Sequence, residues 1–333
     1  MKKSFKSGLI VLIIVILVSA GITVKTIIDS KNPTITVTYA SHGNVSNYNP
    51  EIAKGYKKSY IAAVYIEGTI QQSGQDYDQN WLLNTISSLK EDKNNVGIAL
   101  YVDSPGGAVY QADEAYLALM DYKTSGKPVY VYQGPMAASG GYYISCAGDK
   151  IYANRNTLTG CIGVIFGSSY DLTGLFEKAG IKSETIHSGR NKNMFNYNEP
   201  VTEEQRAIMQ SICDECYEQF VSIVAKRRLM NYDDACELSD GRLYTAKQAL
   251  ENGLIDRIDS WDGMIKDFSE NELDMPGIKV VTFQKERKKT FMDYMTGAAK
   301  QFATSKAAAS LGIPESVIED INTKDYFPMY LYK

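Results

Sequence analysis

The chain begins with a run of hydrophobic positions, Ser7–Val24, which contains no charged residue and ends at Lys25. As a helix this run would be about 27 Å long, close to the thickness of the hydrocarbon part of a bilayer. Three lysines precede it, and such positive charge favours a cytoplasmic N-terminus with the rest of the chain outside. The sequence therefore predicts that residues 1–28 form a cytoplasmic basic tip and a single-pass transmembrane helix in the cell membrane. A cleaved signal peptide, with a cleavage site at 18–20, is the alternative.

Polar and apolar positions divide the remaining chain into three parts. Residues 29–58 are polar and rich in turn-forming residues, so we expect an extracytoplasmic stalk. Residues 59–275 contain the apolar runs of a folded body. Residues 276–333 form a C-terminal extension with a predicted strand at 279–283, a basic run, an alanine-rich helical stretch and a tyrosine-rich end.

In the body, short continuous apolar runs alternate with segments whose apolar residues recur at helical spacing. Strands are predicted at 60–66, 96–102 and 128–132, and helices are predicted between them at 80–89 and 109–122. Such alternation is typical of an α/β fold in which helices cover the faces of a parallel sheet. Ligands of these folds bind at the carboxyl ends of the strands. Two glycine-rich turns, 104–107 and 134–141, are expected there.

Two later helices begin with capping boxes, in which a threonine is followed three residues later by a glutamine. Thr202–Gln205 opens a long amphipathic helix that we expect to end near Leu229. Thr245–Gln248 opens a short helix, and Gly253 is expected to end it.

Composition and charge exclude several classes of protein. With 44% hydrophobic residues, the 333-residue chain can bury a core, so disorder is excluded. A net charge of −4 provides no field that would hold a phosphate backbone, so no nucleic-acid partner is expected. The five cysteines are too few for a disulfide scaffold, and Cys213 and Cys216 are interpreted as packing residues of the long helix. Of the two histidines, His42 lies near the predicted anchor, which leaves His187 and favours a mechanism without histidine.

Ser139 is the first candidate for chemistry. It is followed by two glycines and then by an apolar segment, so we expect it to open a helix. The free N–H groups at a helix start, together with the helix dipole, can stabilise an oxyanion next to a nucleophile. The turn at 104–107 could direct a second N–H toward the same point. A serine that only caps the helix is the alternative interpretation.

Five motifs follow one another along the body, beginning at positions 103, 134, 159, 240 and 253. They read Asp-Ser-Pro-Gly-Gly-Ala, Gly-Pro-Met-Ala-Ala-Ser-Gly-Gly-Tyr-Tyr-Ile-Ser, Thr-Gly-Cys-Ile-Gly-Val-Ile, Asp-Gly-Arg-Leu-Tyr-Thr-Ala-Lys-Gln-Ala and Gly-Leu-Ile-Asp. In this order they resemble the signal peptide peptidase A family over roughly residues 60–259. The resemblance implies the fold shared by the Clp protease subunit and the crotonase enzymes. It also implies a Ser/Lys peptidase without metal or other cofactor, with residues 59–275 as its catalytic domain.

The resemblance also implies roles for individual residues. Ser139 matches the nucleophile, and Lys192, the last residue of a Ser-Gly-Arg-Asn-Lys segment, matches the general base. The N–H group of Gly140, together with that of Gly107 or Gly106, matches the oxyanion donors.

The surroundings of the base differ from the family pattern. Family members commonly have a serine where this chain has Cys161, and a thiol is a weaker hydrogen-bonding group than a hydroxyl. Either Cys161, Thr159 or a water molecule would then orient the lysine amine. Lys182 and Arg190 are competing assignments for the base, and His187 is a further one, although no aspartate that could orient it is evident.

A lysine can act as a base only when its amine is neutral. A lysine side chain in water has a pKa of about 10.4, and burial can lower such a value by about 3–5 units. We therefore expect the body to enclose Lys192 among apolar groups without a carboxylate partner. Activity should then rise through mildly alkaline pH.

The function that the resemblance implies is that of a serine endopeptidase which degrades remnant signal peptides and other hydrophobic peptides at the membrane. Protection against antimicrobial peptides, or a catalytically weak membrane scaffold, are alternatives. A crotonase-like acyl-CoA enzyme is disfavoured, because the leading apolar segment removes the body from cytoplasmic CoA. By analogy with single-copy family members we expect a ring or dome of about eight identical subunits. Residues 326–333, which are apolar and aromatic, would pack on the body or occupy a substrate groove as a self-ligand.

Overall fold

In the computed structural model, the described residues are, with side chains, 58–167, 170–194 and 196–285 and, as backbone alone, 35–38 and 45–48. They belong to one compact unit that ends at Glu286, and a second unit, 287–333, lies outside the described residues. The predicted anchor at 7–24 and the terminal segment 326–333 also lie outside them. Within the described ranges, no helix combines the length and the apolar character needed to cross a membrane.

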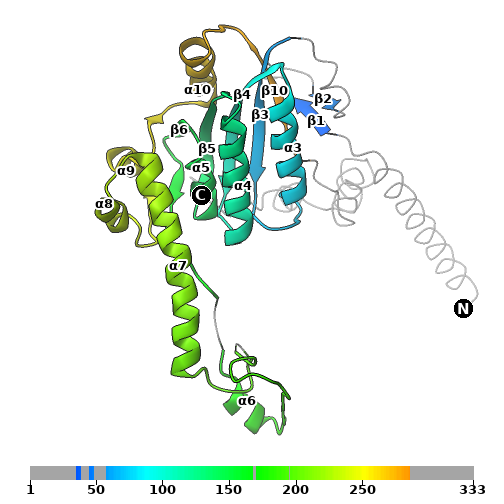
Figure 1. Ribbon diagram of the computed structural model, residues 1–333, viewed down its shortest axis with the longest axis vertical. Helices are drawn as coiled ribbons and strands as arrows, with labels where there is room; N and C mark the ends of the chain where they lie inside the picture. The colour runs from blue at the N-terminus through cyan, green and yellow to red at the C-terminus, as the bar shows by residue number, and fades with distance from the viewer. Residues whose placement is uncertain (1–34, 39–44, 49–57, 168–169, 195, 286–333) are drawn as a thin grey trace, which may run out of the picture. The chain divides into compact units, whose positions relative to one another are not determined.

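An eight-stranded, predominantly parallel sheet forms the centre of the described unit (Figure 1). Parallel strands follow one another across it in the order β10 (Lys279–Phe283), β3 (Tyr60–Glu67), β4 (Asn95–Ser104), β5 (Val129–Ala138), β6 (Lys150–Ala153) and β9 (Arg257–Ile258). The short β7 (Leu158–Gly160) pairs in parallel with the end of β5, and β8 (Leu243–Thr245) is antiparallel to β7. The predicted α/β fold with a parallel sheet is confirmed.

A small antiparallel pair of strands forms a separate two-stranded sheet beside β10. It consists of β1 (Ile35–Thr38) and β2 (Val45–Tyr48), both within the segment predicted as a stalk. The strand predicted at 279–283 is present as β10, where it pairs with β3, so the sheet extends into the segment predicted as a C-terminal extension.

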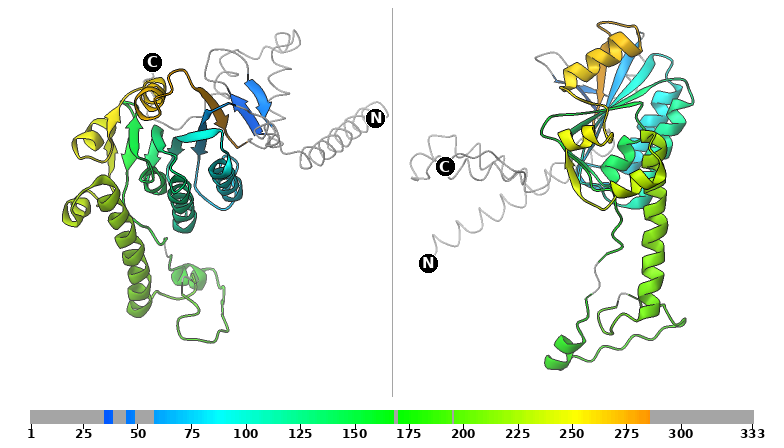
Figure 2. Two further views of the ribbon diagram at one scale, coloured as in Figure 1. Left: turned by 45° about the horizontal axis from the view of Figure 1, so that its top comes forward. Right: turned by 90° about the vertical axis from the view of Figure 1, so that its left-hand side faces the viewer.

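Helices cover both faces of the sheet (Figure 2). Since successive side chains of a strand point to opposite faces, Leu100 joins the larger core and Ala99 the smaller one. The larger core lies under α3 (Gln79–Glu91), α4 (Val109–Lys123) and α5 (Gly140–Ser145). The smaller core lies under α10 (Trp261–Asp267) and the π-helix η1 (Phe268–Glu272).

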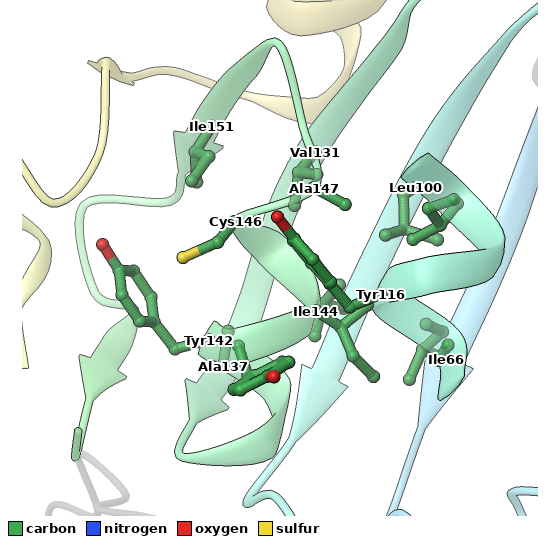
Figure 3. Close-up of a cluster of buried hydrophobic side chains, with 14 of the residues drawn as sticks. Ile66, Leu100, Tyr116, Val131, Ala137, Tyr142, Ile144, Cys146, Ala147 and Ile151 are labelled. Atoms are coloured by element: carbon green, nitrogen blue, oxygen red, sulfur yellow. The ribbon is translucent and has the colours of Figure 1, made fainter. Parts of the chain in front are cut away.

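The short helix α5 is buried along its whole length. Figure 3 shows Ile144, from this helix, among side chains of three neighbouring strands, Ile66, Leu100 and Val131. Burying one large apolar side chain contributes about 1.5–3 kcal/mol. The start of α5 therefore has a fixed place at the ends of the strands.

The remaining helices are α6 (Thr173–Lys178), α7 (Glu203–Arg228), α8 (Tyr232–Glu237) and α9 (Ala246–Glu251). Both predicted capping boxes are present, at Thr202 before α7 and at Thr245 before α9. Gly253 follows α9 with a φ of +72°, as its predicted role at the end of that helix requires.

The first part of α7 and the loop before it extend away from the sheet, together with α6 (Figure 2). We call the described residues from Gly163 to Glu218 the arm. Helix α6 has no buried residue. In α7 the buried residues, apart from Gln205, belong to the part after the arm, namely Phe220, Val221, Val224 and Ala225.

Candidate active site

The carboxyl ends of β4 and β5 lie side by side and carry two of the motifs found in the sequence. The register between these strands shifts after Val102, so that β5 contains a bulge before Ala137. At this bulge the Oδ1 of Asp103 accepts the N–H of Met136 at 3.2 Å. Burial raises the pKa of Asp103, and the hydrogen bond from Met136 partly opposes that effect.

Ser139 occupies the turn between β5 and α5. Its φ is +52° and its ψ is −119°, a backbone conformation that costs a non-glycine residue about 1–3 kcal/mol. The N–H of Ser139 donates to the carbonyl of Gly160 at 2.7 Å, and its carbonyl accepts the N–H of Tyr143 at 2.9 Å. A strained serine between a strand and a helix is the geometry that presents a nucleophilic hydroxyl. Helix capping alone does not explain Ser139, because its side chain accepts no capping bond.

Two glycine N–H groups flank this serine. Gly140 is the first residue of α5, where an N–H group has no acceptor within the helix. On the β4 side, the N–H of Ile70 donates to the carbonyl of Gly106, and the N–H of Ala108 donates to the carbonyl of Ile70, both at 2.9 Å. Gly107 stands between these two bonded residues, so its own N–H points away from Ile70 and toward the end of β5.

The close approach of the two loops depends on glycine. A Cβ on Gly107 would lie 1.9 Å from the carbonyl oxygen of Ile70, and a Cβ on Gly106 would lie 2.7 Å from the Cβ of Ser139. The N–H of Gly106 already donates to the Oγ of Ser104 at 3.1 Å. Of the two predicted alternatives, the geometry therefore favours Gly107 over Gly106 as the second donor.

Thr159 and Cys161 lie at the end of β7, beside the bond between Gly160 and Ser139. The hydroxyl of Thr159 is buried and donates to the carbonyl of Ala137 at 2.8 Å, so its proton is committed to the backbone. Cys161 is partly exposed and has a φ of +51°. Of the two side chains predicted to orient the base, that of Cys161 is therefore more accessible to a lysine amine than that of Thr159.

Lys192 lies on the arm, and the structure does not bring it to Ser139. Its side chain is exposed, which differs from the predicted enclosure among apolar groups. The preceding Asn191 donates to Glu204, in the first turn of α7, at 3.1 Å. The other end of α7 reaches α5, where Phe220 packs on Tyr143 with ring centroids 4.9 Å apart. At 1.5 Å per residue, Glu204 and Phe220 are about 24 Å apart along the helix axis.

The alternative bases lie on the same arm. His187, Lys182 and Arg190 are all exposed, and the Nδ1 of His187 is 3.2 Å from the carbonyl oxygen of Gly189. None of them offers a base beside Ser139 within a single chain.

Two residues at the site were missing from the predicted set. Asp103 holds the β5 bulge, and the carbonyl of Gly160 holds the N–H of Ser139. Both belong to motifs that the sequence displays, so the motifs identified the loops but not these contacts. The five cysteines form no disulfide, and Cys213 and Cys216 are partly exposed on α7 rather than in a core.

A strained serine between two glycine N–H groups is the arrangement of a serine hydrolase. Similar proteins narrow this class to the serine peptidases. The model of peptidase family S49 matches residues 121–274. A putative signal peptide peptidase SppA of Enterococcus faecium is 32% identical over 98% of this chain and 95% of its own length. The chain belongs to peptidase family S49.

Two other relatives by sequence agree with this membership. A putative protease of a Synechocystis strain is 33% identical over 68% of this chain and 80% of its own length. Protease 4 of Haemophilus influenzae is 32% identical over 61% of this chain, which corresponds to 33% of that longer protein. Among solved structures, a ClpP1 mutant of Listeria monocytogenes has 18% identity and a TM-score of 0.42, and the match covers 61% of this chain and 94% of that one.

Proposed function

We propose that the chain is a membrane-anchored serine endopeptidase in which Ser139 is the nucleophile and Lys192 is the general base. The observation that carries this proposal is the strained backbone of Ser139 between the glycines that flank it. Ser139→Ala should abolish both peptide hydrolysis and labelling by a fluorophosphonate. Labelling that persists in this variant would refute the assignment, and an active variant would refute the mechanism.

In the proposed reaction, the neutral amine of Lys192 takes the proton of the Ser139 hydroxyl, and the alkoxide forms a bond to the peptide carbonyl carbon. The N–H groups of Gly107 and Gly140 stabilise the negative oxygen that results. Lys192 then gives its proton to the leaving nitrogen as the C–N bond breaks. Water attacks the acyl-enzyme and its proton passes to Lys192. Lys192 then returns that proton to the Oγ of Ser139 as the acyl–oxygen bond breaks, so the carboxylic product leaves and both side chains are regenerated.

The position of Lys192 suggests that a second copy of the chain completes the site. Within one chain, the residue before Lys192 is bonded to Glu204, which lies about 24 Å along the axis of α7 from Phe220, the residue that packs on Tyr143. The arm also exposes large apolar side chains, among them Ile165 and Ile186 at 89% and 94% exposure. Contact with a neighbouring subunit would cover such side chains and remove Lys192 from water, as a neutral amine requires. The predicted ring of about eight subunits would repeat this contact around its circumference.

Mixing two inactive variants tests this arrangement. If the two residues act across subunits, Ser139→Ala and Lys192→Ala chains should regain part of the activity when they assemble together. If they act within one chain, the mixture should stay as inactive as its components. A mixture of Ser139→Ala with the double variant Ser139→Ala/Lys192→Ala is the control, because it contains no nucleophile.

We propose hydrophobic peptides at the membrane as the substrates. The relative in Enterococcus faecium is named a putative signal peptide peptidase, which supports remnant signal peptides as one such class. Antimicrobial peptides have the same apolar character and remain the alternative. The predicted anchor at 7–24 supports a single-pass protein with its catalytic domain outside the cytoplasm. Hydrolysis of both peptide classes by vesicle-embedded enzyme, with Ser139→Ala as control, would rank them.

A further inference from the structure

One hydroxyl group, that of Tyr143, joins the three elements that carry the proposed catalytic groups. Tyr143 lies in α5, and its hydroxyl donates to the Oδ1 of Asp113, in α4, at 2.7 Å. The same hydroxyl accepts a hydrogen bond from the Nε2 of Gln219, in α7, at 2.7 Å. Helix α5 begins directly after Ser139, α4 follows the glycine turn after β4, and α7 continues from the arm into the body.

The backbone of Tyr143 is bound to the proposed nucleophile itself. Its N–H donates to the carbonyl of Ser139 at 2.9 Å and so closes the first turn of α5. A displacement of the Tyr143 side chain is therefore transmitted to Ser139 through one hydrogen bond. Ser139 holds a strained backbone conformation, which persists only while its surroundings oppose relaxation.

The ring of Tyr143 is fixed as firmly as its hydroxyl. It is 4% exposed, it meets the ring of Tyr116 edge-on at 5.6 Å, and it packs on Phe220. Burial and the bond to Asp113 raise the pKa of Tyr143, so its hydroxyl keeps its proton and serves as a junction rather than as a base. Arg227 adds a second link between α7 and α5, since its Nε donates to the carbonyl of Cys146 at 2.9 Å.

We propose that Tyr143 is a positioning residue that couples the seating of the arm to the geometry of Ser139 and of the glycine donors. This rests on the proposed function, because the arm carries Lys192. In a subunit whose arm contacts a neighbour, that contact would fix the position of α7. Through Gln219 and Tyr143, α7 would then keep Ser139 of the same subunit in the reactive conformation. Each copy would thus need its arm in place both to supply a base and to keep its own nucleophile aligned.

The adjacent Tyr142 provides a matched control. It lies in the same helix, its side chain is fully buried, and its hydroxyl donates at 2.8 Å to the carbonyl of Leu254, which lies outside α4 and α7. Tyr142→Phe and Tyr143→Phe each remove one buried hydroxyl from α5. Only the second change removes bonds to the elements that carry the catalytic groups.

The kinetic test compares these variants in the full-length enzyme in vesicles. We expect Tyr143→Phe to lower kcat by about tenfold or more with KM within about twofold, because misaligned groups slow chemistry more than binding. Gln219→Met should lower kcat by a smaller factor, since it removes only the link to the arm. Tyr142→Phe should leave kcat within about twofold of the parent. Equal kcat values for Tyr142→Phe and Tyr143→Phe would overturn the proposal.

Amide hydrogen exchange separates this proposal from the catalytic assignment. In Tyr143→Phe the amides of residues 140–143 and 203–219 should exchange faster than in Tyr142→Phe, because the hydroxyl that links the two helices is lost. This measurement needs no catalytic activity, so it decides the coupling even if Ser139→Ala were to remain active. Unchanged exchange in both helices would overturn the coupling, whatever the kinetics.

Discussion

The body and the arm of this peptidase are built in opposite ways. In the body, α5 is buried throughout and Ser139 is held by backbone hydrogen bonds on both of its sides. In the arm, α6 has no buried residue, and Ile165 and Ile186 are almost fully exposed. The proposed nucleophile therefore stands on a prearranged site. The proposed base stands on a segment whose apolar surface needs another partner.

In the proposed mechanism, the oxyanion donors therefore lie in the body and the base lies in the arm. An oxyanion site needs donors that are already oriented, which a packed body supplies. A lysine base needs removal from water, which a contact between subunits can supply when the complex forms. Activity would then depend on assembly, and an unassembled chain would carry an intact oxyanion site without its base.

The largest expected effect comes from a comparison of the same substitution at a glycine of the body and at a glycine of the arm. Gly107→Ala should lower kcat by about 100-fold or more, because a Cβ there would lie 1.9 Å from the carbonyl oxygen of Ile70 and displace the proposed donor. Gly174→Ala, in α6, adds a carbon that has no atom within 4 Å among the described residues outside its own helical backbone, and it should leave kcat unchanged. Peptide hydrolysis by the two purified variants checks this. Similar losses in both would remove the distinction between body and arm.

A second comparison concerns apolar side chains and separates stability from assembly. Leu100→Ala should reduce the free energy of unfolding by about 2–5 kcal/mol, because Leu100 is completely buried in the larger core. Ile186→Ala should change it by less than about 0.5 kcal/mol, because Ile186 is 94% exposed.

Urea unfolding measures the change in the free energy of unfolding. Sedimentation measures the size of the assembly. Ile186→Ser should shift the protein toward smaller assemblies if the arm is an interface between subunits. An unchanged assembly, with Ile165→Ser equally without effect, would leave the arm without its proposed partner.

The smallest expected effect is the acid sensitivity that Asp267 gives to the body. Burial raises the pKa of Asp267, but hydrogen bonds from Tyr152, Asn271 and Lys150 outweigh it and lower the pKa to about 2. A lowered pKa means that Asp267 stabilises the fold fully above its unfolded-state pKa of about 3.9 and loses this contribution as the pH falls toward 2. Asp267→Asn should lower the urea midpoint at pH 7 and reduce its further decrease between pH 4 and pH 2. A parallel pH dependence in both proteins would contradict this.

Much of the fold could be predicted because its signals are local. The apolar run at 60–66 became β3, the helical spacing at 109–122 became α4, and Thr202 caps α7 as its capping box indicates. The turn at Ser139 was also predictable, since small residues before a helical segment mark a helix start. The strained φ of Ser139 could not be predicted, because it results from contacts with residues elsewhere in the chain.

By itself the sequence determined the order of strands and helices, their caps and the loops that carry the chemistry, because side-chain periodicity and turn chemistry act over a few residues. Only the tertiary structure decided that Asp103 closes the β5 bulge, that the N–H of Gly106 is bonded to Ser104 while that of Gly107 points away from Ile70, and that Lys192 is exposed on the arm. These features depend on register between strands and on how far a helix extends from the core. Such distances are set by contacts between residues remote in sequence, which no local pattern records.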